Sequence, residues 1–174
     1  MMRQLRIAAV LLALALLCCG CMQNGSGDSW KLKAGDPVPA ITLTSTDGTT
    51  HNLADKKGKV VLVAIFATWC GPCRQELPEL DAELYKPFKD KGLLVYAVNT
   101  GEDKATVDGF AKSSGLSFPL LIDEQSRLSE TLGGSFLPRG VLIDKDGKLQ
   151  EFFVGYDPDK IKTELPKKIE ALLK

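Results

Sequence analysis

One stretch of the chain constrains the fold more than any other: residues 59–76, KVVLVAIFATWCGPCRQE. Its first half is a continuous apolar run rich in β-branched residues, which is typical of a strand buried on both faces of a sheet. Beyond the two cysteines, four apolar residues recur at spacings of three, four and four and predict one face of a helix: Leu77, Leu80, Leu84 and Phe88. The sequence therefore predicts that Cys70 and Cys73 lie where a buried strand meets a helix.

The remaining sequence alternates between predicted strands and helices. Residues 41–53 alternate apolar and polar positions around Asp47-Gly48, which predicts a β-hairpin. Further strands are expected at 92–99, at 118–123 and as a pair within 140–155, and helices at 102–115, 124–134 and 157–174. Pro78, in the early turns of its helix, is expected to kink it, and Pro166 to kink or break the last helix. This order of elements indicates an α/β fold with a mixed sheet covered on both faces.

The N-terminal region is predicted to direct export. Arg3 and Arg6 precede an apolar run at residues 7–17, which has the length of a signal-peptide core and is too short to span a bilayer. A Gly/Ser/Lys-rich stretch follows, as expected of a flexible tether. The sequence therefore divides into a signal peptide, a tether and one domain, at residues 1–20, 21–35 and 36–174.

The end of this signal resembles a bacterial lipobox, because Gly20 stands directly before Cys21. The resemblance implies cleavage after Gly20 and lipidation of Cys21, which would anchor the chain to a membrane. Cys18 departs from the pattern, since an aliphatic residue is usual there. A plain secretory signal with incidental cysteines is the alternative, and both readings export the protein.

Composition narrows the chemistry. The 174 residues include 22 basic and 22 acidic side chains with no basic stripe, so nucleic-acid binding has no electrostatic support. Of the five cysteines, Cys18 and Cys19 leave with the signal and Cys21 is blocked by lipid. One thiol pair remains, Cys70 and Cys73.

The spacing of this pair suits thiol–disulfide exchange. Cys70 at a helix N-terminus is expected to have a lowered pKa, because unpaired backbone N–H groups and the helix dipole favour the thiolate. Cys73 lies one turn further on, within reach of a disulfide. Alternatives are an inert structural disulfide, a zinc site or a copper carrier, but His51 is the only histidine and precedes the pair in a polar turn, where a solvated side chain is expected. We expect no metal and no cofactor.

WCGPC between such a strand and helix resembles the thioredoxin superfamily, and the wider sequence is similar to its exported, membrane-tethered TlpA/ResA branch of thiol-disulfide oxidoreductases. The similarity covers residues 35–172 through the hairpin, the cysteine segment, GLSFPLLID and GGSFLPRGVLIDKDGKL. It implies a thioredoxin-like three-layer sandwich with an N-terminal β-hairpin and a central strand–helix insertion. It also implies a reductase of disulfides in exported proteins such as apocytochromes c, supplied by a membrane thiol-electron donor.

The resemblance assigns roles around the cysteines. Pro138 matches the cis-proline opposite the pair, and Leu137 would offer main-chain groups to an extended client segment. An ordinary trans-proline entering a strand is the alternative for Pro138. Trp69 and Pro72 would form an apolar rim around the thiols as substrate-binding residues, although Trp69 could equally pack in the core.

Glu76 matches an acidic residue of this branch, which could accept the Cys73 proton when partly desolvated. As an exposed side chain it would instead be a partner for the helix dipole. Two residues depart from the family: Ala64 replaces a buried polar residue, and Arg139 follows the cis-proline where a small hydroxyl residue is usual. Arg139 is expected either to favour acidic clients or simply to be solvated.

The sequence thus predicts a monomeric, lipid-anchored oxidoreductase of the cell envelope facing the periplasm. Met22 after the lipidated cysteine favours the outer membrane. The Gly-Pro dipeptide between the cysteines resembles that of thioredoxin, with a potential of about −270 mV, and favours reduction over oxidation. A thiol peroxidase is disfavoured, because Val63 and Ala67 stand where its Pro and Thr are required. A non-catalytic metal-carrying or client-binding module remains the rival.

Overall fold

The structure is a computed structural model of the chain and describes residues 30–174. The predicted signal peptide, the lipidation site Cys21 and most of the predicted tether lie outside the described residues. Within residues 30–174, none of the helices is both long enough and apolar enough to cross a membrane.

A seven-stranded mixed sheet forms the centre of the domain, in the order β2-β1-β5-β4-β3-β6-β7. β3 pairs in parallel with β4 and antiparallel with β6, and β4 pairs in parallel with β5. The two ends of the sheet are antiparallel pairs, β1 with β2 and β6 with β7. The strands are β1 (Thr42–Ser45), β2 (Thr50–Asn52), β3 (Val60–Phe66), β4 (Leu93–Thr100), β5 (Leu120–Asp123), β6 (Arg139–Ile143) and β7 (Leu149–Val154). The predicted hairpin, mixed sheet and central apolar strand are confirmed.

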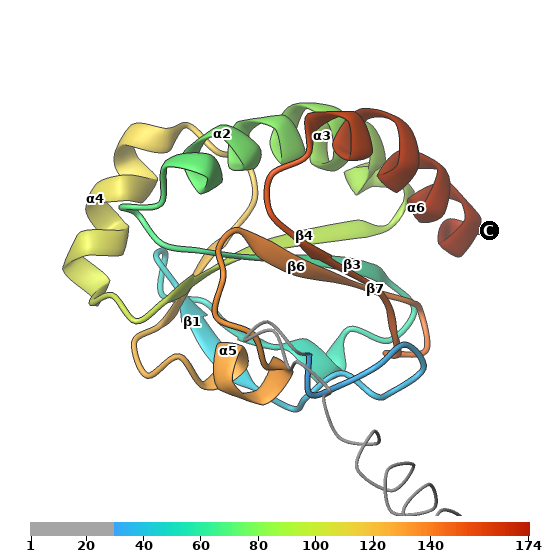
Figure 1. The fold of residues 1–174 in the computed structure, drawn as a ribbon, viewed down its shortest axis with the longest axis horizontal. Helices are drawn as coiled ribbons and strands as arrows, with labels where there is room; N and C mark the ends of the chain where they lie inside the picture. Colours follow the sequence, from blue (N-terminus) through green and yellow to red (C-terminus); the bar gives the residue numbers. More distant parts are fainter. Residues whose placement is uncertain (1–29) are drawn as a thin grey trace, which may run out of the picture.

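Helices cover both faces of this sheet, as Figure 1 shows. α2 (Gly71–Glu79), α3 (Lys86–Phe88), α4 (Lys104–Ser114) and α6 (Leu165–Leu173) lie on one face, and α5 (Arg127–Leu132) lies on the other. Because side chains alternate along a strand, β3 supplies both cores. Val60, Leu62 and Ala64 pack with the α2 layer. Val61, Val63 and Ile65 pack with the α5 layer. The predicted three-layer sandwich is confirmed.

Near the two prolines the chain stays helical but changes between α-helical and π-helical geometry. Regular α-helix gives way two residues after Pro78 to a π-helical segment, η2 (Leu80–Tyr85), which leads into α3 and a 3-10 turn, η3 (Lys89–Lys91). A second π-helical segment, η4 (Lys160–Glu164), precedes α6, which carries Pro166 in its first turn. A proline removes one N–H donor and clashes with the preceding turn, and a π-turn absorbs both effects locally.

Packing begins before the predicted domain start at residue 36. We call residues 30–36 the N-terminal strap. Its Trp30 forms an isolated bridge with Gly133, and the Lys31 amide donates to the Leu132 carbonyl at 2.8 Å. The Trp30 ring lies 4.8 Å from the Phe152 ring, measured between centroids. Residues 30–35, assigned from the sequence to the tether, therefore pack against the domain.

A short 3-10 helix, η1 (Leu53–Asp55), adds Leu53 to the core on the α5 side.

Candidate active site

Cys70 is the N-cap of α2. Its backbone is extended, at φ −75° and ψ 106°, and its sulfur accepts a hydrogen bond from the Cys73 amide at 3.2 Å. Pro72 occupies a first-turn position, where a missing N–H costs nothing. The buried strand β3 ends four residues earlier, so the strand delivers Cys70 to the positive end of the helix. The sequence prediction for this junction is confirmed.

The two cysteines form a disulfide with an S–S distance of 2.00 Å and a Cα–Cα distance of 5.3 Å. Cys70 is 4% exposed, whereas Cys73 has no exposed surface. Only Cys70 can therefore meet an external disulfide, and Cys73 is restricted to attack from within. Both cysteines belong to the apolar core of the α2 layer, as does the fully buried Ala64. Ala64 supplies no acid, so a proton acceptor has to come from elsewhere.

Glu76 supplies a buried carboxyl group one helical turn beyond Cys73. It is 2% exposed, and burial raises its pKa from 4.5 to about 8. Among the described residues its Oε2 atom is buried without a hydrogen-bond partner. Glu76 also lines a cavity of about 220 Å³ next to Val154 and Gly155 of the β7 end. The exposed, dipole-partner alternative for Glu76 is therefore wrong, because the side chain is buried.

Glu102 fixes the turn that precedes Cys70. Its carboxylate accepts three hydrogen bonds of 2.6 Å, from the Thr68 amide, the Thr68 hydroxyl and the Asn99 side-chain amide. Partial burial alone would raise the pKa of Glu102, but the bonds from Thr68 and Asn99 outweigh it and lower the pKa. Neither Glu102 nor Asn99 is among the site residues predicted from the sequence. The available signal is their position at the carboxyl end of β4, the parallel neighbour of β3: Asn99 is the penultimate residue of the strand and Glu102 lies two residues beyond its end.

The loop before β6, residues 133–138, is called here the cis-proline loop. The Leu137–Pro138 peptide bond is cis, as predicted, and the Pro138 carbonyl accepts a hydrogen bond from the Gly155 amide at 2.8 Å. Leu137 is partly buried against both cores. Phe136 of this loop is 60% exposed, a large apolar side chain that the sequence prediction did not include.

Trp69 and Pro72 are both exposed next to the cysteines. Trp69 is 73% exposed, so packing in the core is excluded for its side chain. Isolated exposed apolar residues are common on proteins, and here the exposed indole stands directly before Cys70. The rim position predicted for both residues agrees with this exposure.

Arg139 differs from both expectations. It is 2% exposed and therefore neither solvated nor able to meet an acidic client. Alternation along β6 explains the burial: Arg139 shares a face with Val141 and Ile143, whose side chains pack in the α5 layer. The cysteines lie in the α2 layer on the opposite face.

His51 also differs from its predicted place. It lies in β2 instead of a polar turn, and its ring contacts the Tyr96 ring at 5.0 Å between centroids. Partial burial, followed by the positive charge of Lys56, lowers its pKa. Within residues 30–174 no group of three or more Cys, His, Asp or Glu side chains is arranged to hold a metal ion.

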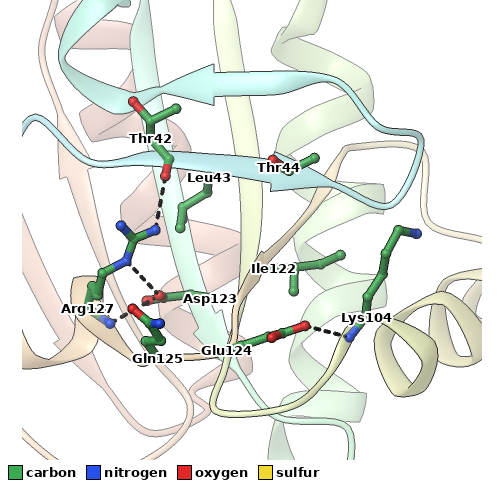
Figure 2. A pocket seen from close by; sticks show the side chains of 9 residues that line it. All are labelled: Thr42, Leu43, Thr44, Lys104, Ile122, Asp123, Glu124, Gln125 and Arg127. Carbon is green, nitrogen blue, oxygen red and sulfur yellow. Dashed lines mark hydrogen bonds and ion pairs between the residues drawn. The ribbon is translucent and has the colours of Figure 1, made fainter.

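A larger cavity of about 400 Å³ lies elsewhere, between β1, β5 and the starts of α4 and α5. Its charged side chains are already paired: Figure 2 shows Arg127 reaching Asp123 and the Thr42 carbonyl, and Glu124 accepting from the Lys104 amide. The Lys104 ammonium pairs with Asp108. The Asp123 carboxylate also accepts from the Arg127 and Leu128 amides and so caps α5. These charges stabilise the fold, and none of the predicted site residues lines this cavity.

A strand that presents a disulfide at a helix N-terminus, opposite a cis-proline, defines a thioredoxin-like thiol-disulfide oxidoreductase. The Redoxin family model matches residues 33–172, and the chain belongs to that family.

Known proteins agree with this class. Thiol-disulfide oxidoreductase ResA of Geobacillus thermodenitrificans is 36% identical over 151 residues, covering 87% of this chain and 86% of the relative. A Chlorobium tepidum structure described as a thiol:disulfide interchange protein DsbE is 32% identical with a TM-score of 0.76, covering 83% of this chain and all of that one. An exposed lipoprotein thioredoxin of Streptococcus pneumoniae is 29% identical with a TM-score of 0.65, covering 76% and 98% of the two chains. The chain is therefore a thiol-disulfide oxidoreductase similar to ResA.

Proposed function

We propose that this oxidoreductase works as a lipid-anchored reductase of disulfides in exported proteins. The observation that carries the proposal is the unequal burial of the pair, since Cys70 caps α2 with a little surface exposed and Cys73 has none. The helix N-terminus favours the Cys70 thiolate, so the exposed sulfur is also the better nucleophile.

The reaction begins when the Cys70 thiolate attacks one sulfur of the client disulfide. The client S–S bond breaks, a mixed disulfide forms, and the other client sulfur leaves as a thiolate. The Cys73 thiolate then attacks the Cys70 sulfur, which restores the Cys70–Cys73 bond and releases the second client thiolate. Two electrons pass from the protein to the client, and a membrane thiol-electron donor would restore the dithiol.

Glu76 is the proton acceptor for Cys73 in this scheme. Its raised pKa, about 8, lies close to the usual thiol value of about 8.5, so a proton can pass between the two groups in either direction with little cost. Oε2 is buried and not engaged by another described side chain or amide, which leaves it available to the thiol.

The cell-envelope location rests on the sequence of residues 1–21 and on the lipoprotein relative from Streptococcus pneumoniae. Cys21→Ala is expected to release the protein from the membrane fraction, whereas a Cys18→Ala control should leave it there. An unchanged membrane fraction for Cys21→Ala would contradict lipid anchoring. Apocytochromes c are the proposed clients by resemblance to the TlpA/ResA branch.

A redox titration of Cys70 and Cys73 tests the direction of the reaction. We expect a midpoint close to that of thioredoxin, about −270 mV, and a value near that of the strong oxidants, about −120 mV, would reverse the assignment. Cys73→Ser is expected to trap client chains as mixed disulfides with Cys70, and Cys70→Ser is the matched control that should trap none.

A further inference from the structure

Arg139 is a permanently charged side chain that the fold buries directly after the cis-proline. Its Nη2 donates to the Ser129 carbonyl at 3.3 Å, and its Nη1 donates to the Gly133 carbonyl. Ser129 lies in the last turn of α5 and Gly133 is its C-cap, so the guanidinium sits at the helix end where the dipole favours a cation. Burying a guanidinium is costly in free energy unless hydrogen-bond acceptors surround it, and the two carbonyls supply such acceptors here.

The contacts connect the two ends of the cis-proline loop. Gly133 begins the loop and Arg139 follows its last residue, so the guanidinium reaches back over six positions to the loop's own start. Gly133 and Gly134 have φ values of 85° and 78°, in the region that favours glycine. Two consecutive glycines give the loop more backbone freedom than other residues would, and the Arg139 contact offsets that freedom.

The N-terminal strap also contacts the Arg139 guanidinium. The Arg139 guanidinium lies 5.6 Å from the centroid of the Trp30 ring, close enough for a cation–π interaction. Trp30 itself bridges to Gly133, and the Lys31 ammonium donates to the Glu130 carbonyl at 2.9 Å. Strap, α5 and loop therefore meet at one buried charge.

We propose that Arg139 is a positioning residue that sets the client-binding cis-proline loop by clamping its ends to α5 and to Trp30. It does not touch the client, because its side chain lies on the face of the sheet opposite the cysteines. It acts through Phe136 and Leu137, the loop residues that an extended client would meet. The inference rests on the proposed reduction of protein disulfides at this face.

The clamp makes a prediction that differs from simple stabilisation. An apolar side chain of similar length removes the buried charge, but it leaves the Gly133 and Ser129 carbonyls without the guanidinium donors and cannot hold them in place. Loss of the clamp should therefore weaken binding of a polypeptide client while leaving the cysteine chemistry intact. Lysine, with a single ammonium group, should restore part of the effect.

The experiment mixes pre-reduced protein with insulin or with 5,5′-dithiobis(2-nitrobenzoic acid) and records the rate against substrate concentration. For Arg139→Met we expect about a tenfold rise in the half-saturating insulin concentration, equivalent to about 1.4 kcal/mol of client binding. The maximal rate with insulin and the rate with the small disulfide should each stay within about twofold of the parent protein. The midpoint potential of the Cys70–Cys73 pair should not shift. Arg139→Lys should lie between Arg139→Met and the parent protein.

Arg127→Met is the matched control. Arg127 is the first residue of α5 and contacts Asp123 and the Thr42 carbonyl, away from the cis-proline loop, so this variant should not change the insulin curve. An unchanged half-saturating concentration in Arg139→Met, with the parent protein active, overturns the inference and leaves the proposed function standing. An equal loss of rate with insulin and with the small disulfide also overturns the inference, because it indicates a general defect of the variant. A parent protein that reduces the small disulfide but not insulin would instead remove the proposed function and this inference with it.

Discussion

At the scale of single residues, the buried carboxyl of Glu76 couples the chemistry of the site to the stability of the fold. Its spacing from Cys73 is visible in the sequence, but its burial is not, since that depends on β7 and the end of the chain closing over it. The same limit applies to Arg139, whose side of the sheet follows from strand register. Sequence patterns identify residue types at a site more readily than the side on which a long polar side chain is buried.

Glu76→Gln is expected to remove a pH dependence of stability from the oxidised protein. The folded-state pKa of Glu76 is raised to about 8 from an unfolded value of 4.5, so between these values the folded state holds one more proton than the unfolded chain. The contribution of Glu76 to the free energy of unfolding should therefore be highest below pH 4.5. It should fall as the pH rises to about 8, by at most about 5 kcal/mol.

Urea unfolding of the oxidised protein from pH 5 to pH 9 measures this effect. Glu76→Gln should show a flatter profile than the parent protein and be relatively more stable at pH 9. Glu79→Gln, on the same helix but partly exposed in an ion pair with Lys162, is the control and should keep the parent profile. Parallel profiles for Glu76→Gln and the parent protein would contradict a raised pKa.

Gly140 marks a close approach between the central strand and its neighbour. A Cβ atom there would lie 2.4 Å from the Val63 carbonyl oxygen and 2.4 Å from Cζ of Phe153. Because the backbone oxygen cannot move aside, Gly140→Ala is expected to lower the free energy of unfolding by about 3 kcal/mol. Gly109→Ala in α4 meets no atom within 4 Å and should instead raise it by about 0.5 to 1 kcal/mol. Thermal unfolding of both variants decides between these signs.

At the scale of elements, the segment joining β4 to α4 supports the active-site turn through Glu102. Glu102→Gln replaces one acceptor oxygen with an amide donor, so at least one of the bonds from Thr68 or Asn99 is lost. We expect a stability loss of about 1 to 3 kcal/mol and faster hydrogen exchange at the Thr68 amide. Glu124→Gln keeps an acceptor oxygen for its single exposed bond from the Lys104 amide and should cost less than about 1 kcal/mol. Unchanged exchange at Thr68 would show that Glu102 does not hold the turn.

Element types were more predictable than their internal geometry. The period of the apolar residues gives the helix after Cys73, and Gly115 with φ 66° ends α4 where the sequence predicts. The π-helical turns after Pro78 and before Pro166 were predicted only as kinks or breaks. Their form depends on the core contacts of Leu80, Leu84 and Leu165, which keep both segments helical despite the missing donors.

At the scale of the whole molecule, the strap decides where the domain begins. Composition alone places residues 30–35 in a tether, because residues 22–35 as a whole are rich in Gly, Ser and Lys and the packing partners are distant in sequence. Trp30 reaches Phe152 and Arg139, and Lys31 reaches the end of α5, contacts that span about a hundred positions or more. Non-local contacts of this kind leave no periodic signal in the strap itself.

A chain beginning at residue 36 should therefore be less stable than one beginning at residue 29. It loses the Trp30 ring contacts and the two hydrogen bonds of Lys31, which together correspond to about 2 to 4 kcal/mol of unfolding free energy. Trp30→Ala in the longer chain should account for more than half of the loss, because a large aromatic side chain contributes more than two peripheral hydrogen bonds. Urea titration of the three proteins measures both quantities. Equal midpoints for the two chain lengths would show that the strap rests on the surface without stabilising it, and would also remove Trp30 from the group that holds Arg139.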